Sequence, residues 1–318
     1  MIQNQIVHFL KKAEGYISGE EISRQLKLSR AAIWKNIEEL RGDGYEIEAV
    51  PHRGYRLVAC ADKLFPHEIQ FNLGTKVLGK QVIHHDSISS TMDEAFELGV
   101  KGAAEGTVVC AENQTKGRGR LGRNWVSPKG KGIYLSLILR PLLTPTEVAQ
   151  LTLLSAVAVS EAVKKICGVT TSIKWPNDLL INNKKVAGIL MESSSQMDNV
   201  RFVVLGIGLN VNTTLSHLPP HSTSLKQETG KQISRVVLIQ EILRHLEKWY
   251  DILKIKGFAP VLTKWKELSS TLGRRVRIVD SSGELEGEAI GLDAQGGLMI
   301  RSESGIAVKR MTGDVILI

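Results

Sequence analysis

The 318-residue sequence predicts an α+β protein of several domains. Three patterns indicate this fold class. Apolar residues near the N-terminus have helical spacing, strand and helix patterns mix from about residue 65, and short glycine-punctuated strands follow from about residue 270. We therefore expect domains at 1–60, 65–268 and 270–318, with the first boundary in the aperiodic, proline-containing segment 59–68.

The composition is that of an ordinary globular protein, with 42% hydrophobic and 23% charged residues. No apolar run approaches the roughly 20 residues that span a bilayer, and the polar N-terminus does not resemble a signal peptide. We expect a cytoplasmic protein without membrane contact. Cys60, Cys110 and Cys167 lack the spacing of a disulfide framework or a zinc site. The net charge of +8 favours anionic partners without identifying them.

The first 60 residues predict three helices followed by a hairpin. Ser18 and Glu21 have the spacing of a capping box, and Ser29 can cap the third helix. Residues 45–59 predict two short strands with a turn near His52–Gly54. This order of elements is typical of a winged helix-turn-helix domain.

This N-terminal segment has side chains suited to DNA binding. A recognition helix presents short residues to the major groove, and cations around it contact phosphates. The candidate DNA-binding residues are Ser29, Arg30, Ala31, Lys35 and Arg53. Because the segment carries nine Lys/Arg against eight Asp/Glu, a small helical domain that binds protein is the alternative.

The central part predicts a sheet that is largely antiparallel. Several of its predicted strands are joined by tight turns, such as Asn182–Asn183, rather than by the long crossovers that parallel strands require. From residue 270 onward, short strands separated by Gly, Ser and Asp predict a small β-barrel.

The segment "TKGRGRLGRNW", residues 115–125, matches the glycine spacing of dinucleotide-binding turns. Such a turn needs a helix that starts within the motif, whereas Pro128 and the surrounding glycines predict a loop. The loop 116–131 has six Lys/Arg and no acid, so we expect it to stay mobile until an anion binds. Trp125 can stack on a base or cover an apolar ligand. The segment therefore predicts phosphate binding, with a solvated basic loop as the alternative.

Other central residues have two interpretations each. Asp178 can hold Mg²⁺ or orient a phosphate, or it is a simple turn residue. Lys185 follows a tight turn and can reach across the sheet, or it faces solvent. Thr91 and Glu94 fit a capping box. The small residues of 206–210 permit either close approach of a ligand or tight packing.

Taken together, these motifs resemble the bifunctional biotin protein ligase/biotin operon repressor family over nearly the whole chain. The segments "SRAAIWKNIEELR" and "VPHRGYRL" are similar to its N-terminal DNA-binding domain. The segments that resemble its catalytic domain, in the same order, are "DSISSTMDEA", "ENQTKGRGRLGRNW", "KWPNDLLI", "KKVAGILMES" and "GIGLNVN". The resemblance implies an N-terminal winged helix-turn-helix, a central mixed-sheet α/β catalytic domain like that of lipoate ligases, and an SH3-like C-terminal β-barrel.

The resemblance also implies an activity. The family joins biotin and ATP, with Mg²⁺, into biotinyl-5′-AMP and passes biotin to a lysine of a biotin carboxyl carrier protein domain. With the adenylate as corepressor, a homodimer binds operator DNA of biotin synthesis genes, and we expect the strand Gly188–Ser193 to pair across its two-fold axis. The alternatives are a biotin-sensing repressor without ligase activity and a ligase for another acid such as lipoate.

Site residues follow from the same resemblance. The implied biotin-binding residues are Ser90, Thr91, Met92, Gln114, Arg118, Gly119, Arg120, Lys185 and Gly188. The implied ATP- or adenylate-binding residues are Arg123, Trp125 and Asn210, and the implied catalytic residues are Arg118, Arg120, Lys185 and Asp178. Asp178 would also assist placement of Mg²⁺. Met92 and Leu121 differ from the polar and basic residues that some family members carry there.

Overall fold

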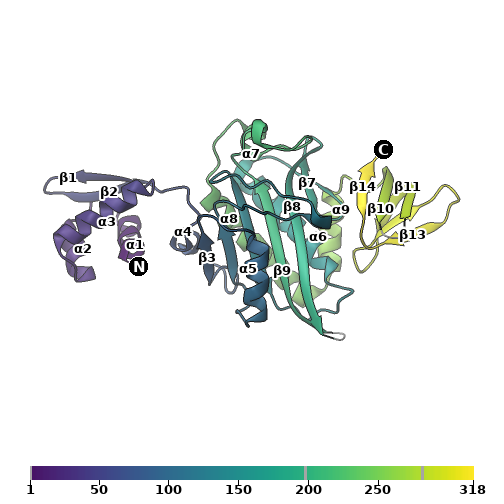
Figure 1. Cartoon of the computed structure of the whole chain (residues 1–318), viewed down its shortest axis with the longest axis horizontal. Coiled ribbons are helices and arrows are strands. Elements are labelled where there is room, and N and C mark those ends of the chain that lie inside the picture. The colour runs from purple at the N-terminus through teal and green to yellow at the C-terminus, as the bar shows by residue number, and fades with distance from the viewer. Residues whose placement is uncertain (1, 197–198, 281–282) are drawn as a thin grey trace. The chain divides into compact units, whose positions relative to one another are not determined.

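A computed structural model describes residues 2–196, 199–280 and 283–318 (Figure 1). Contacts between backbone positions divide the chain into two compact units, residues 1–63 and 64–318. Each unit has a core of its own, and each is described by itself below.

The first unit contains the predicted three helices and hairpin, which confirms the winged helix-turn-helix fold. Its elements are α1 (Ile2–Lys12), α2 (Gly19–Leu26), α3 (Arg30–Gly42), β1 (Glu46–Val50) and β2 (Gly54–Ala59). The Ser18 hydroxyl accepts the Glu21 N–H at 3.0 Å and the Ser29 hydroxyl accepts the Ala32 N–H at 3.2 Å. Both predicted N-caps are therefore formed.

The hairpin packs closely on the segment that precedes α2. Gly54 has a φ of +101°, and a Cβ atom there would lie 2.1 Å from the Ile17 carbonyl oxygen. Only glycine fits this position. The Arg53 guanidinium lies 4.2 Å from the centre of the Tyr16 ring, which holds this cation beside the turn.

The second unit begins with mixed helices and strands. Its helices are α4 (Pro66–Gln70), α5 (Thr91–Val100), α6 (Ala149–Cys167), α7 (Leu225–Thr229), α8 (Arg235–Lys256) and α9 (Ala259–Leu268). Its first strands are β3 (Val82–His85), β4 (Val108–Ala111), β5 (Gly132–Leu139), β6 (Ser172–Lys174), β7 (Asp178–Ile181), β8 (Lys184–Gln196) and β9 (Asn199–Asn210).

These seven strands form one sheet in the order β3-β4-β5-β9-β8-β7-β6. The β3–β4 pair is parallel and the other pairs are antiparallel, so the predicted, largely antiparallel sheet is confirmed. Asn182 and Asn183 both have positive φ, 50° and 60°, in the turn between β7 and β8. This is the backbone that a two-residue hairpin turn requires.

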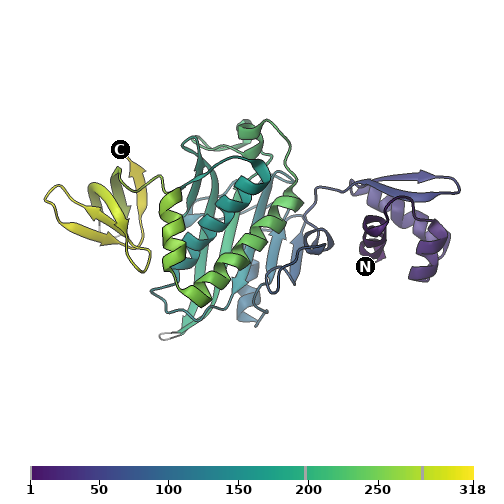
Figure 2. The ribbon, with the colours of Figure 1, turned by 180° about the vertical axis from the view of Figure 1, so that it is seen from behind.

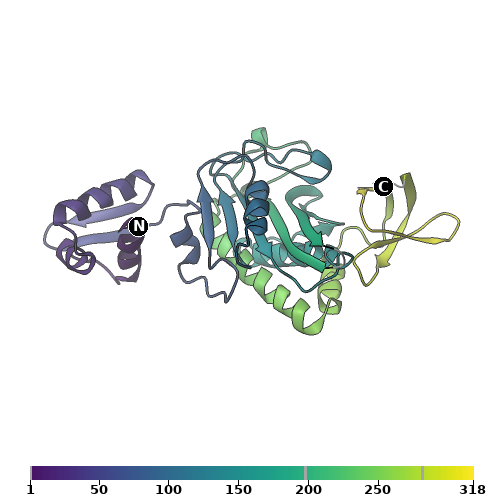
Figure 3. The ribbon, with the colours of Figure 1, turned by 60° about the horizontal axis from the view of Figure 1, so that its bottom comes forward.

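Helices cover both faces of the sheet. The helices α6, α8 and α9 pack on one face (Figure 2), and α5 packs on the other (Figures 1 and 3). The strand β5 is consequently buried along its whole length. A sheet covered in this way is rigid, and its loops and strand ends are where a ligand can enter.

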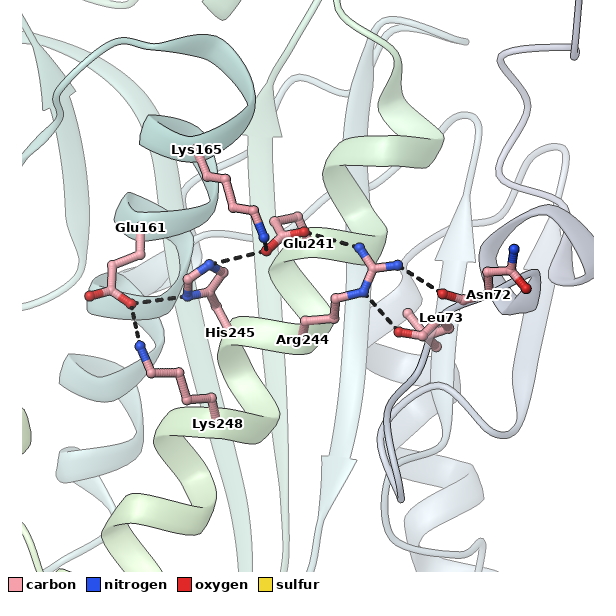
Figure 4. Close-up of polar contacts among 8 residues, drawn as sticks. All are labelled: Asn72, Leu73, Glu161, Lys165, Glu241, Arg244, His245 and Lys248. Atoms are coloured by element: carbon pink, nitrogen blue, oxygen red, sulfur yellow. Dashed lines mark hydrogen bonds and ion pairs between the residues drawn. The ribbon is translucent and has the colours of Figure 1, made fainter.

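A charged network fastens α6 to α8 (Figure 4). The His245 ring lies between two carboxylates, with Nδ1 3.0 Å from Glu161 Oε2 and Nε2 3.2 Å from Glu241 Oε1. Arg244 donates to the Leu73 carbonyl at 2.8 Å and so connects α8 to the segment after α4.

The chain ends in five short antiparallel strands. These are β10 (Arg275–Asp280), β11 (Gly283–Leu292), β12 (Leu298–Arg301), β13 (Ala307–Arg310) and β14 (Asp314–Leu317), in the order β13-β12-β11-β10-β14. Their apolar side chains belong to the same core cluster as those of the central sheet. The Trp175 indole N–H donates to the Gly296 carbonyl at 3.1 Å, so the two parts are joined by hydrogen bonds as well. The predicted small β-structure at the C-terminus is confirmed.

Candidate active site

A cavity of about 230 Å³ lies where α5, the loop 114–126 and strands β5, β8 and β9 meet. It is lined by these sequence-predicted residues: Thr91, Met92, Gln114, Arg118, Gly119, Arg120, Arg123, Trp125, Asp178, Lys185, Gly188 and Asn210. Ser90 does not line it. The buried Ser90 lines a separate depression beside α5, so the cavity does not include this predicted residue.

A chain of side-chain hydrogen bonds orients the polar end of the cavity. The Thr91 hydroxyl and backbone N–H both donate to Gln114 Oε1, at 3.1 and 2.9 Å. The Ser136 hydroxyl donates to Thr91 Oγ1 at 2.9 Å, and the Gln114 amide NH₂ donates to Ser127 Oγ at 3.0 Å. The Gln114 amide is therefore fixed in one orientation.

This arrangement corrects one prediction. Thr91 is the first residue of α5 and the N-cap position is Ser90, which makes no side-chain cap hydrogen bond. The predicted capping box of Thr91 and Glu94 is therefore wrong, because the Thr91 hydroxyl bonds to Gln114 instead. Ser136 was not predicted, although a lone serine in the apolar run "GIYLSLIL" is the signal that could have indicated it.

The wall beside this polar end is apolar. Met92 is only 4% exposed, and a Cβ atom at Gly206 would lie 2.5 Å from its sulfur. A methionine side chain fills irregular space and makes favourable apolar contacts. The cavity thus joins a hydrogen-bonding end to a hydrophobic wall, which suits a ligand with a polar ring and an aliphatic tail.

Trp125 packs against Gly188 of β8 and Gly208 of β9. A Cβ atom would lie 2.5 Å from its ring at Gly208 and 3.1 Å from it at Gly188, so the two glycines make room for the indole. The small residues of 206–210 therefore serve tight packing in this structure. Within the described chain, the buried Trp125 Nε1 has no hydrogen-bond partner, and an unsatisfied donor of this kind can bind a ligand.

The arginines of the loop face carboxylates from other elements. Arg118 lies 2.8 Å from Asp93 on α5 and 3.0 Å from Glu192 on β8. Although neighbouring cations in the loop repel one another, these acids offset the repulsion in the structure. An anionic ligand would compete with the two carboxylates for the Arg118 guanidinium.

Arg120 reaches the C-terminal sheet. Its guanidinium donates to Asn177 Oδ1 and to the Gly313 carbonyl, each at 3.0 Å. Burial lowers the pKa of Arg120, and the charges of Asp314 and Asp178 oppose this shift. Asp314 is also paired with Arg123. No sequence signal connected these residues, because Gly313 and Asp314 lie far along the chain from the loop.

Lys185 points across the hairpin rather than into solvent. Its ammonium lies 2.7 Å from Asp178 Oδ1 and 5.5 Å from the centre of the Trp125 ring. The structure favours the interpretation in which the Lys185 side chain reaches across the sheet. Among the described residues, no group of three or more His, Cys, Asp or Glu side chains could hold a metal ion.

The loop itself forms no nucleotide-binding helix start. Residues Arg120–Gly122 make one 3₁₀ turn, in which Leu121 has a φ of 55° and is 75% exposed. The expectation that this segment is a loop and not a dinucleotide-binding turn is confirmed by this geometry.

The predicted DNA-binding residues lie on the surface of the first unit. Ala31 and Lys35 are exposed on α3, Arg30 pairs with Glu20 at 2.6 Å, and Ser29 caps α3 with its hydroxyl.

Comparison with known proteins assigns each part of the chain. Residues 2–56 match the HTH domain family, residues 85–210 match the biotin/lipoate A/B protein ligase family, and residues 271–317 match the biotin protein ligase C-terminal domain family. The bifunctional ligase/repressor BirA of Bacillus subtilis is 44% identical over 94% of this chain and 93% of its own length. This chain belongs to the bifunctional ligase/repressor BirA family.

More distant members of the family agree. BirA of Escherichia coli is 30% identical over 94% of this chain and 92% of its own length. A biotin protein ligase from Aquifex aeolicus, solved in complex with biotin and ATP, is 32% identical, with a TM-score of 0.63 over 75% of this chain and 99% of that chain. The resemblance predicted from the motifs is confirmed. No helix in the described parts of this family member is long and apolar enough to cross a membrane.

Proposed function

We propose that this protein joins biotin and ATP into biotinyl-5′-AMP, transfers biotin to a lysine of a biotin carboxyl carrier protein, and represses biotin synthesis genes with the adenylate bound. One observation carries the enzymatic part: a single cavity combines a hydrogen-bonding end, an apolar wall and a cationic end. The similar Aquifex ligase, solved with biotin and ATP, supports this assignment.

The polar end of the cavity suits the ureido ring of biotin. The Thr91 hydroxyl and the Gln114 amide are fixed by mutual hydrogen bonds and can exchange them for bonds to the ring. Met92 and Gly206 would contact the apolar part of the ligand. Ser90 lies next to this end and contributes its position at the start of α5 rather than a cavity-lining hydroxyl.

The first chemical step brings two anions together. A biotin carboxylate oxygen attacks the α-phosphorus of ATP, the new P–O bond forms, and the bond to the β-phosphate oxygen breaks as pyrophosphate leaves. Arg118, Arg120 and Lys185 line the cavity and would offset the charge that builds up during attack. Gly119 and Gly188 line the same cavity and would lie beside the ligand.

The nucleotide would lie beside Trp125. An indole stacks on a purine, and Asn210 and Arg123 line the same cavity. The loop 116–131, here called the arginine loop, would close over the adenylate. Its closure would exclude water, which would otherwise hydrolyse the mixed anhydride.

In the second step the carrier lysine amine attacks the acyl carbon, an amide bond forms and AMP leaves. The amine must lose a proton, and we propose that Asp178, whose carboxylate lines the cavity, accepts it. Its present partner is Lys185, so we propose that the phosphate of the adenylate takes over Lys185 and frees the Asp178 carboxylate.

Mg²⁺ would accompany ATP. Magnesium is usually held by one or two carboxylates together with substrate phosphates, and Asp178 offers one carboxylate in the cavity. This donor set fits an ion that arrives with the nucleotide and does not fit a resident metal centre. The ion would neutralise phosphate charge during pyrophosphate departure.

Repression would require a homodimer and operator DNA. The strand β8 pairs with β7 only as far as Gly188. Among the described residues, no strand pairs with the outer edge of β8 from Leu190 onward, which supports pairing of this edge across a two-fold axis. Two winged domains could then contact both halves of a palindromic operator. Sedimentation with and without biotin and ATP tests this: a monomer under both conditions contradicts it.

Mass spectrometry of a carrier domain after incubation with the protein, ATP and biotin tests the ligase. The expected product carries one biotin on a lysine, and an unmodified carrier despite adenylate formation would favour a sensing repressor without transfer. Calorimetry with biotin against lipoate separates a lipoate-type ligase, since a ureido site leaves buried polar groups unpaired with a dithiolane. Arg120→Gly is expected to release the adenylate faster than the wild type.

A further inference from the structure

The recognition helix α3 exposes a large aromatic side chain. Trp34 is 58% exposed, whereas Ile33 and Ile37 on the same helix are fully buried. Ala31 and Lys35 are also exposed, and Ala31 lies three residues before Trp34 and four before Lys35, which are the spacings of neighbours on a helix surface. Within the described chain, the Trp34 indole makes no hydrogen bond, ring contact or cation–π contact. An exposed indole without a partner inside the protein is available for an external one.

Three acidic residues near this face have partners within the first unit. Glu38 binds Arg41 at 2.6 Å, Glu39 accepts a hydrogen bond from Gln3 at 2.7 Å, and Glu20 pairs with Arg30. Glu38 and Glu20 are therefore each compensated by an arginine, whereas the neutral Gln3 amide leaves the charge of Glu39 in the last turns of α3 in place. The alternative of a protein-binding domain was based on the near balance of charge, and this balance does not extend to residues 30–37 of α3, which contain two cations and no acid.

Two lysines near this face, in contrast to Arg30 and Arg41, are not paired with an acid of the described chain. Lys35 on α3 and Lys27 in the turn that precedes it are exposed and form no ion pair with any described residue. The uncompensated charge at the start of the recognition helix is therefore positive. An exposed apolar side chain on a helix that also carries an unpaired cation matches the major groove of DNA, where apolar base groups lie between phosphates.

We propose that Trp34 determines operator specificity by packing its indole against the C5-methyl group of a thymine in the major groove. Ala31, one turn before, is short enough to let α3 approach the base edges, and Lys35 contacts a phosphate. Thymine is the base that offers an apolar group in the major groove. The proposal rests on the repressor function proposed above and adds the residue and the base that provide part of its specificity.

Selection from a random duplex pool, with biotin and ATP present, supplies the DNA for the test. The selected duplex is then compared with copies in which single thymines are replaced by deoxyuracil, which removes only the methyl group. The wild type is expected to lose about tenfold in affinity at one thymine of each half-site. Trp34→Ala is expected to bind the thymine duplex about tenfold more weakly and to bind the thymine and deoxyuracil duplexes equally well.

Two control variants distinguish a base contact from a general loss of binding. Val58→Ala removes another exposed apolar side chain of the same unit, 56% exposed on β2, and is expected to leave the methyl preference unchanged. Lys35→Ala is expected to weaken binding to all sequences alike and to lower the salt dependence by about one charge, whereas Trp34→Ala leaves the salt dependence unchanged.

The outcomes separate the two proposals. A wild-type protein that selects no sequence contradicts both the repressor function and the role of Trp34. If the wild type selects a sequence and Trp34→Ala keeps its affinity and methyl preference, the role of Trp34 alone is wrong. That second result would assign the exposed indole to a protein partner.

Discussion

Glu112 and Arg235 form an ion pair in the interior of the second unit, with 2.7 Å between Oε2 and Nη1 and exposures of only 2% and 1%. The other Glu112 oxygen accepts the Leu64 N–H at 2.7 Å. Arg235 also donates to the carbonyl of Gly132, the first residue of β5, at 3.3 Å. The pair thus connects the end of β4, the start of α8 and the strand that follows the arginine loop.

Glu112→Gln is expected to reduce the free energy of unfolding by about 3–5 kcal/mol, because it leaves the buried Arg235 charge without a counter-ion. Urea unfolding of the second unit measures this. Replacing both residues, as Glu112→Gln with Arg235→Met, is expected to recover part of the loss. Glu267→Gln, which removes the partner of Lys264 in a surface pair, should cost less than about 1 kcal/mol. Equal losses at the two sites would contradict the structural role of the buried pair.

The same pair predicts a pH dependence. Burial alone would raise the pKa of Glu112, but the His84 hydrogen bond, the Arg235 charge and the Leu64 N–H together lower it from 4.5 to about 2. A carboxyl whose pKa is depressed by folding stabilises the protein above its unfolded pKa, and this stabilisation is lost as pH falls toward the folded pKa. The stability difference between wild type and Glu112→Gln should therefore narrow below about pH 4.5. A difference that stays constant from about pH 6 to pH 3 would refute this.

Ser136→Ala is expected to raise the KM for biotin about fivefold with little change in kcat, because one hydrogen bond that orients Thr91 and Gln114 is lost. Pyrophosphate release under steady-state conditions measures both constants. Ser155→Ala is the matched control, since Ser155 is equally buried but donates to the Leu151 carbonyl of its own helix. A similar change of KM in both variants would mean that Ser136 acts only on stability.

Much of this architecture could be predicted from local patterns. The caps at Ser18 and Ser29 and the turn at Asn182–Asn183 depend on side chains and backbone preferences a few residues apart, so sequence spacing was enough to locate them. The arginine loop was recognised because glycine and proline exclude a helix there. Each of these features is encoded within a single short segment.

The errors and omissions share a different cause. The Thr91 hydroxyl binds Gln114 rather than capping α5, and Arg120 binds Gly313 and Asn177. These partners come from other strands and loops, so spacing along the chain carries no signal for them. Asp314 reaches the cavity only because the C-terminal sheet shares a core with the central one. Contacts of this kind follow from tertiary packing.

Gly208→Ala is expected to raise the KM for ATP about tenfold, because the added methyl group would lie 2.5 Å from the Trp125 ring and displace it. Gly206→Ala is the control, because Gly206 lies two residues before Gly208 on β9 and lines the same cavity. Its methyl group would meet the flexible Met92 sulfur, also at 2.5 Å, and the thioether can move. We expect this control variant to raise the KM for biotin more than the KM for ATP. An unchanged KM for ATP in Gly208→Ala would remove Trp125 from the nucleotide site.

The three cysteines are expected to react with an aromatic disulfide reagent at very different rates. Cys60 is exposed, whereas Cys110 is buried and Cys167 is partly buried. Burial, aided by the charge of Glu112, raises the pKa of Cys110 to about 12, and burial raises that of Cys167 to about 11. Since the thiolate is the nucleophile, one fast equivalent is expected in the native protein at about pH 8, and the other two only after unfolding. Cys60→Ser should abolish the fast phase, and a fast phase that survives this substitution would show that a second thiol is accessible in the native fold.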